Sequence, residues 1–178
     1  MENKNSRQFI FYSVEGLRFA LPLNQVIRVV QAAEVTPLPG APDSIQGIIN
    51  VQGDIIPVFN TRKYLGFSEK SLDPGDYFLL VKSGTQPMAM WVTDVQNIEE
   101  IEPGRISRNA SAPSGLKSFE GVIKAGQEMI YIQNAARFIS RENGETLQEA
   151  LLELKSNTAG SEDPQKTTDQ EPDSPHDQ

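Results

Sequence analysis

FIFYSVEGLRFAL, residues 9–21, is the stretch of the sequence that decides the fold. Phe9 and Phe11 fall on one face of an alternating strand. The other face of that strand holds Ile10, Tyr12 and Val14. Glu15-Gly16 then interrupts the pattern, and a second alternating run ends at Leu21. Two such runs separated by a two-residue turn with glycine predict a β-hairpin.

The segment after this hairpin predicts more β structure and one short helix. A β-rich run at 26–30 leads into the loop TPLPGAPDS, where prolines disfavour helix and central strand. GIINVQGDIIPVF then predicts a second hairpin, because Gly53 can supply the positive φ of a tight turn. Asn60 is placed to cap a short helix that Gly66 ends.

The second half of the chain repeats the pattern of the first. A shift of 69 positions places Phe9-Ile10-Phe11-Tyr12 on Phe78-Leu79-Leu80-Val81. A shift of 74 places Gly47-Ile48-Ile49 on Gly121-Val122-Ile123, and Asn60 on Asn134. The alternative is chance coincidence of apolar residues, but glycines and asparagines match too and the order is preserved. The repeat predicts two related β units that are each too small to bury much alone.

The predicted fold class is mainly β, with two small pseudo-repeated five-stranded β barrels side by side, short helices, a C-terminal helix and a disordered acidic tail. The predicted domain covers 8–156, with repeat units at about 8–66 and 77–140, after a flexible N-terminus at 1–7. A period of 3.6 and a capping box at Thr146 and Glu149 predict the helix at about 146–156, docked on the domain. The tail spans 157–178. Whether strands are exchanged between the two units stays open.

The composition excludes several classes of function. The chain has 178 residues, no cysteine, and one histidine, His176. Cysteine chemistry and Ser/His pairs inside the fold are therefore excluded, and we expect no metal and no cofactor. A formal charge of −8 argues against nucleic acid. Since no signal peptide or membrane-spanning run is evident, we expect a cytoplasmic protein without direct membrane insertion.

The candidate catalytic groups lack partners. Glu99, Glu100 and Glu102 fit a solvated strand edge better than an acid–base pair. The glycines at 47–53 lack the lysine and hydroxyl that complete a phosphate loop. Asp54 and Asp94 have no neighbouring group to tune them. We therefore expect no enzymatic activity and a protein-binding module; a hydrolase with isolated carboxylates and an OB-like ligand-binding module are the rivals.

Four blocks of the sequence resemble the CheW family of chemotaxis coupling proteins. They are LPLNQVIRVV, LPGAPDSIQGIINVQGDIIPVFNTRKYLG, VTDVQNI and EGVIKAGQEMIYIQNAARF, which together span most of residues 9–140. The resemblance implies two small β barrels and no enzymatic activity. It also implies two partners, the regulatory domain of a CheA-type histidine kinase and the cytoplasmic tip of a methyl-accepting chemoreceptor. A chemosensory pathway other than flagellar chemotaxis, such as pilus motility, is the alternative setting.

The resemblance also implies partner-binding residues. Val26, Val29, Val95 and Ile98 would line a groove between the barrels that meets the receptor tip. Gly47, Asn50 and Gly53 would lie on the hairpin that governs kinase contact or subdomain packing. Plain core packing is the alternative for each position.

Five positions bear on partner choice. Gln52 stands where the family usually has Arg, and Arg28 stands where an acidic residue is frequent. Asn60 and Thr93 each replace an Asp, while Arg62 is kept. Arg28, Gln52 and Arg62 join the predicted contact residues. Since a lost guanidinium and a reversed charge alter recognition, we expect a specialised set of partners.

Overall fold

The computed structural model describes residues 6–84 and 86–160, and this part is mainly β. The strands are β1 (Arg7–Val14), β2 (Leu17–Pro22), β3 (Val26–Gln31), β4 (Ile45–Val51), β5 (Asp54–Phe59), β6 (Tyr77–Ser83), β7 (Gln86–Val92), β8 (Asp94–Ile101), β9 (Ile106–Ser107), β10 (Phe119–Ala125) and β11 (Glu128–Gln133). The helices are α1 (Thr61–Tyr64) and α2 (Arg141–Ala159), with single 3-10 turns η1 (Leu23–Gln25), η2 (Pro103–Arg105) and η3 (Ala135–Arg137).

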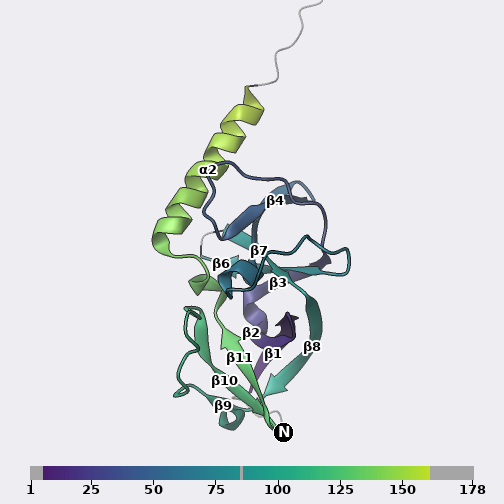
Figure 1. Cartoon of the computed structure of the whole chain (residues 1–178), viewed down its shortest axis with the longest axis vertical. Helices are drawn as coiled ribbons and strands as arrows, with labels where there is room; N and C mark the ends of the chain where they lie inside the picture. The colour runs from purple at the N-terminus through teal and green to yellow at the C-terminus, as the bar shows by residue number, and fades with distance from the viewer. Residues whose placement is uncertain (1–5, 85, 161–178) are drawn as a thin grey trace, which may run out of the picture.

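Each of the two sheets contains strands from both halves of the sequence (Figure 1). The first sheet has the order β8-β1-β2-β11-β10-β9, and the second has the order β3-β6-β7-β5-β4. Both are antiparallel except where β2 meets β11 and β5 meets β7, which pair in parallel. The sequence repeats at 8–66 and 77–140 are therefore interleaved in space, and neither forms a sheet of its own.

The two sheets are related by the sequence repeat. The repeat makes β1 to β5 equivalent to β6, β7, β8, β10 and β11, in that order. Exchanging each strand of the first sheet, apart from β9, for its equivalent gives the strand order of the second sheet. The register follows the same rule: Ala20 pairs with Ile132 in the first sheet, and Ala89 pairs with Val58 in the second. The predicted mainly β fold with two pseudo-repeated barrel-like units is confirmed, with its strands exchanged.

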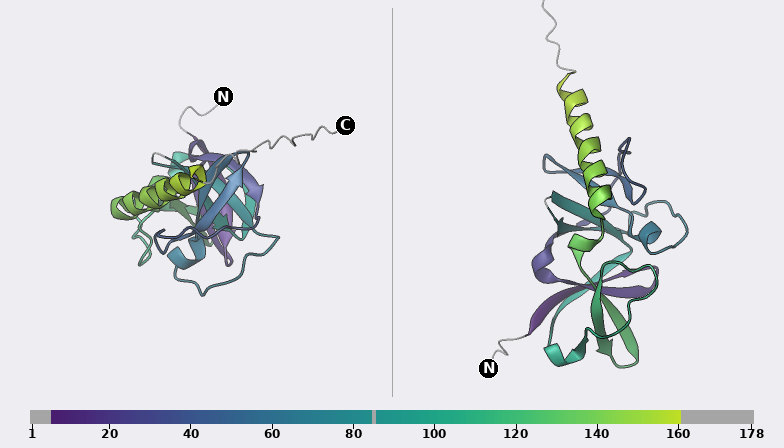
Figure 2. Two further views of the ribbon diagram at one scale, coloured as in Figure 1. Left: turned by 90° about the horizontal axis from the view of Figure 1, so that it is seen from above. Right: turned by 90° about the vertical axis from the view of Figure 1, so that its left-hand side faces the viewer.

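The central strands bury side chains on both faces. Phe9 and Phe11 of β1 pack inside the first sheet, whereas Ile10, Tyr12 and Val14 pack between the two sheets. The alternation predicted for this strand is confirmed. β6 does the same from the other side, with Phe78 and Leu80 inside the second sheet and Leu79 and Val81 in the shared core. The two sheets meet along this shared core (Figure 2).

A buried polar network crosses the shared core. The Tyr12 hydroxyl donates to Gln133 Oε1, and Gln133 Nε2 donates to Ser118 Oγ at 3.2 Å. The backbone N–H of Ser118 donates to the Tyr64 hydroxyl at 2.9 Å, so the network joins β1 and β11 to α1. Burial raises the pKa of the Tyr12 hydroxyl well above its ordinary value, and the neighbouring Tyr64 adds to the shift. The hydroxyl therefore stays neutral as a hydrogen-bond donor.

The C-terminal helix begins earlier than the sequence suggests. Its N-cap is Ser140, whose Oγ accepts from the backbone N–H of Asn143 at 3.2 Å. Thr146 lies inside α2 and donates its hydroxyl to the Glu142 carbonyl, so the predicted capping box is wrong. The predicted docking is confirmed, because the stripe buried in the shared core consists of Leu147, Ala150 and Leu151.

The predicted terminal segments differ from the structure at their inner ends. Arg7 already belongs to β1, and Asn157 to Ala159 still belong to α2. Ser6 and Gly160 are described but lie outside these elements. The remaining residues of the predicted flexible N-terminus, 1–5, and of the predicted acidic tail, 161–178, lie outside the described residues.

A substitution at Gly47 would test how closely the loop at Thr36 packs on β4 of the second sheet. A Cβ at Gly47 would lie 2.2 Å from the carbonyl oxygen of Thr36, whose backbone pairs with Ile48. We expect Gly47→Ala to lower the free energy of unfolding by at least about 2 kcal/mol, because backbone must move. Gly104→Ala is the control, since nothing lies within 4 Å of its Cβ position. Urea unfolding of both variants measures the difference, and equal midpoints would contradict this account.

Candidate protein-binding surface

β3 and β8 form edges of the two sheets and correspond to each other in the repeat. β3 pairs only with β6 in its sheet, and β8 pairs only with β1. Both present large apolar side chains to solvent: Ile27 is 48% exposed, Val29 37% and Ile98 53%. An edge strand offers unpaired backbone groups, so an apolar edge is a natural place for another protein to dock.

The four residues predicted for a receptor groove divide into two kinds. Val29 and Ile98 are exposed on these edges. Val26 and Val95 are half-buried and pack against the shared core. Only the first pair is free to make extensive contact with a partner, whereas the second pair also holds the edges against the core. Their role in a common groove stays a prediction.

The β4–β5 hairpin presents three of the predicted partner-binding residues at its tip. Asn50, Gln52 and Gly53 are exposed at its tip, where Gln52 and Gly53 have φ of 56° and 97°. Asn50 Oδ1 accepts from the backbone N–H of Gly53 at 2.8 Å and fixes the turn. Gly47 is buried under the loop at Thr36, so it shapes the hairpin but offers no side chain to a partner.

The two departures at Arg28 and Gln52 contact each other. Arg28 Nη1 donates to Gln52 Oε1 at 3.2 Å, which links β3 to the tip of the β4–β5 hairpin. Both side chains are exposed. The sequence pattern marked each position separately, but only the fold shows that they form one polar contact between an edge strand and the hairpin.

Arg62 is buried inside the protein. Its guanidinium forms an ion pair with Glu15 in the β1–β2 turn and donates to the Ser68 carbonyl at 2.8 Å. It also lies 5.9 Å from the centre of the Phe67 ring. A buried, paired cation of this kind holds α1 against the first sheet, so its predicted partner contact would need the surrounding turn to open.

The other two substituted positions make structural hydrogen bonds. Asn60 Oδ1 accepts from the backbone N–H of Lys63 at 2.9 Å, which confirms the predicted helix cap. Asn60 Nδ2 also donates to Gln46 Oε1 at 2.8 Å, and an ionised aspartate has no hydrogen with which to make this bond. Thr93 Oγ1 accepts from the backbone N–H of Glu15 at 3.3 Å.

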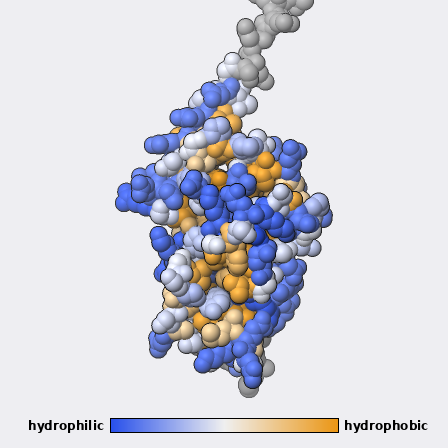
Figure 3. Space-filling model, viewed as in Figure 1, coloured by the Kyte–Doolittle hydropathy of each residue, from blue (hydrophilic) through white to orange (hydrophobic). Residues whose placement is uncertain are grey.

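Sequence reasoning missed two apolar features of the surface. Ile27 is exposed beside the predicted Val26, and nothing in the local alternation distinguishes a free edge from a covered one. A cavity of about 320 Å³ lies between the first sheet, the end of α1 and the loop at 113–116, and its lining includes Leu17, Phe19, Tyr64, Leu65, Leu116 and Tyr131. On the face shown in Figure 3, apolar residues gather along the middle of the molecule between hydrophilic margins.

The described residues hold no evident reactive cluster. Among them, no group of three His, Cys, Asp or Glu side chains is placed to hold a metal ion. Glu99 accepts from Asn97 and Glu100 accepts from Ser6, and Asp54 and Asp94 are exposed. No helix in the described part of the chain is long and apolar enough to cross a membrane.

Comparison with known proteins connects this fold to one family. The family model of the CheW-like domain matches residues 8–143, which is more than half of the chain. The chain belongs to the CheW-like family. This CheW-like chain is 23% identical over 150 residues to the chemotaxis protein CheW of Bacillus subtilis (strain 168), a match that covers 82% of this chain and 94% of that protein.

Two further relatives agree with this assignment. Protein FrzA of Myxococcus xanthus is 25% identical over 140 residues, covering 75% of the CheW-like chain and 85% of FrzA. The crystal structure of the scaffolding protein TtCheW from Thermoanaerobacter tengcongensis matches with a TM-score of 0.70 and 23% identity. That match covers 78% of this chain and 95% of TtCheW, so the fold is shared.

The exposed pair, Val29 and Ile98, and the half-buried pair, Val26 and Val95, should differ in how much they contribute to stability. We expect Val29→Asp and Ile98→Asp to change the free energy of unfolding by less than about 1 kcal/mol, because a charge there stays solvated. Val26→Asp and Val95→Asp bring a charge against the shared core, and we expect each to cost about 2 kcal/mol or more. Urea unfolding of the four variants measures this. Similar losses for all four would show that the edges are covered.

Proposed function

We propose that the protein is a cytoplasmic, non-catalytic adaptor that couples a CheA-type histidine kinase to the cytoplasmic tip of a methyl-accepting chemoreceptor. The observation that carries the proposal is the pair of equivalent apolar edges, β3 and β8, on a CheW-like fold. Binding through such edges needs surface area but no reactive group. The acidic residues considered as catalytic candidates, such as Asp54 and Asp94, belong to no reactive cluster in the described part of the chain.

The proposal assigns the two partners to different surfaces. The exposed side chains of Val29 and Ile98 would contact the receptor tip. The β4–β5 hairpin, with Asn50, Gln52 and Gly53 at its tip, would contact the kinase regulatory domain. Contacts of modest size are typical of signalling assemblies, so each affinity is expected to be micromolar and the array to gain strength from multivalency.

The Arg28–Gln52 contact supports a specialised choice of kinase. It lies between the receptor edge and the kinase hairpin, and it places a positive charge where an acidic residue is frequent in the family. A reversed charge at the rim of an interface changes the encounter rate and its salt dependence. This favours a specialised set of partners, and a chemosensory pathway other than flagellar chemotaxis is the alternative setting.

The receptor assignment is tested with charge substitutions at the exposed edge. We expect Val29→Asp and Ile98→Asp to weaken binding to the receptor tip about tenfold or more, since an interface core does not accept an unpaired charge. Kinase binding is expected to persist. Leu152→Asp is the matched control, because Leu152 is 63% exposed on α2 and belongs to neither of the proposed surfaces. Co-purification and titration with the receptor and kinase of the same cell measure both contacts. Equal effects of all three variants would refute the assignment.

The kinase assignment is tested by restoring the family's residues at the paired positions. We expect Arg28→Glu to change kinase affinity and its salt dependence, because the charge at the rim is reversed. Adding Gln52→Arg restores an opposite-charge pair across the same contact, so the double variant is expected to bind kinases from flagellar systems better than the wild type. A double-mutant cycle gives the coupling. Unchanged affinity in all variants would remove the basis for a specialised kinase.

A further inference from the structure

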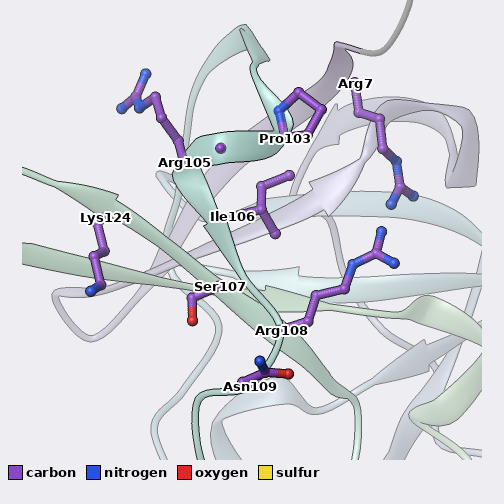
Figure 4. A pocket seen from close by; sticks show the side chains of 9 residues that line it. Arg7, Pro103, Arg105, Ile106, Ser107, Arg108, Asn109 and Lys124 are labelled. Carbon is purple, nitrogen blue, oxygen red and sulfur yellow. The ribbon is translucent and has the colours of Figure 1, made fainter.

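A basic cavity lies at the end of the first sheet where β1, η2, β9 and β10 meet (Figure 4). Its volume is about 840 Å³. Four cations from three parts of the sequence line it, namely Arg7, Arg105, Arg108 and Lys124. No acidic side chain is among its lining residues. All four are exposed, so their charges are available to a ligand. This cavity is called the basic pocket below.

Two of the four cations in the basic pocket face each other, and none of the side chains that line it is acidic. The guanidinium groups of Arg7 and Arg108 point toward one another in Figure 4. None of the four cations forms an ion pair with another residue in the described ranges. Glu100, the nearby carboxylate on β8, accepts from Ser6, and Glu102 does not line the pocket. An anion between the two guanidinium groups would relieve their mutual repulsion.

The net negative charge of the chain makes the basic pocket a distinctive site for an anion. The chain carries a formal charge of −8, so a cluster of four cations is a local reversal of its overall sign. Such a reversal steers a negatively charged group to one end of the molecule. Arginine forks match carboxylates and phosphates alike, so the geometry selects an anion but leaves its source to other observations.

We propose that the basic pocket binds the acidic C-terminal segment, residues 161–178, of a second copy of this chain. That segment carries six acidic residues and one lysine, which makes it the most negative stretch of the sequence. Its composition leaves it little apolar surface to bury, so charge is what it offers to a binding site. The pocket and the segment are therefore complementary in sign and are encoded in the same chain.

The position of the segment assigns it to a neighbouring copy. It follows Gly160, and α2 ends at the opposite end of the molecule from β9 (Figures 1 and 2). Eighteen residues span at most about 60 Å when fully extended. A segment reaching the pocket of its own chain would have to turn back and run along the length of the body, which would cost it conformational freedom. A segment from a second copy meets no such constraint.

This contact joins unlike surfaces, one end of each copy binding the opposite end of the next. Two antiparallel copies that exchange their segments would close into a symmetric dimer, whereas a one-way arrangement would form rings or open chains. It uses neither the β3 and β8 edges nor the β4–β5 hairpin. The self-association is thus independent of the proposed kinase and receptor contacts, and each can fail without the other.

The test is sedimentation velocity on the full chain at low ionic strength over a range of concentrations. The pocket variant carries Arg7→Gln and Arg108→Gln, and the segment variant carries Asp169→Asn, Glu171→Gln and Asp173→Asn. We expect each to weaken self-association about tenfold or more, and 0.5 M salt to do the same. The control carries Arg141→Gln and Lys155→Gln on α2, which changes the net charge as the pocket variant does, and is expected to associate like the wild type.

Mixing the two variants decides whether the contact is between copies. Each variant alone is expected to be monomeric, but one retains the segment and the other retains the pocket, so the mixture is expected to form a one-to-one dimer. A mixture that stays monomeric, or a wild type that does not associate at low salt, overturns the proposal. So does pocket-dependent binding of inorganic phosphate, a single-stranded oligonucleotide or anionic lipid vesicles without self-association, since the occupant would then be another anion.

Discussion

The fold depends on two strands that are buried on both faces. β1 and β6 each send one set of side chains into their own sheet and the other set into the core that both sheets share. A side chain of this size contributes about 1.5–3 kcal/mol when it is removed from water, and neither face can be satisfied without the other sheet. The exchanged strands follow from this, because each half of the chain completes the sheet of the other. The exposed edges β3 and β8, the β4–β5 hairpin and the basic pocket all lie on the outside of the two sheets that share this core.

The sequence predicted the elements better than their assembly. The alternation of Phe9 and Phe11 against Tyr12 gave the two faces of β1, and the shifts of 69 and 74 gave the correspondence of the strands. The same shifts would appear with or without strand exchange, so the pairing of β2 with β11 could not be predicted from the sequence repeat. The start of α2 was misplaced because Thr146 and Glu149 satisfy a capping pattern, whereas Ser140 lies before a polar turn without apolar periodicity.

For the candidate site, too, the sequence pointed to individual residues, whereas the contacts between them are visible only in the structure. The sequence marked Arg28 and Gln52 as separate departures, and their contact across β3 and the hairpin needed the fold. Arg62 was marked as retained, but its burial against Glu15 suits a joint between α1 and the first sheet better than an exposed contact. The basic pocket was invisible in the sequence, because its cations are spread from Arg7 to Lys124 and only the bend at η2 and β9 gathers them.

The parallel pairing of β2 with β11 has a consequence for how the protein is made. Tyr131 and Phe19 lie side by side in the sheet, yet the ribosome adds them more than a hundred residues apart. At about 5–20 residues per second, the first hairpin waits several seconds or more with one edge unpaired and its aromatic side chains uncovered. A nascent chain of this kind is exposed to chaperones and to other nascent chains until β11 emerges, and a product truncated before β11 would leave β2 without its parallel partner.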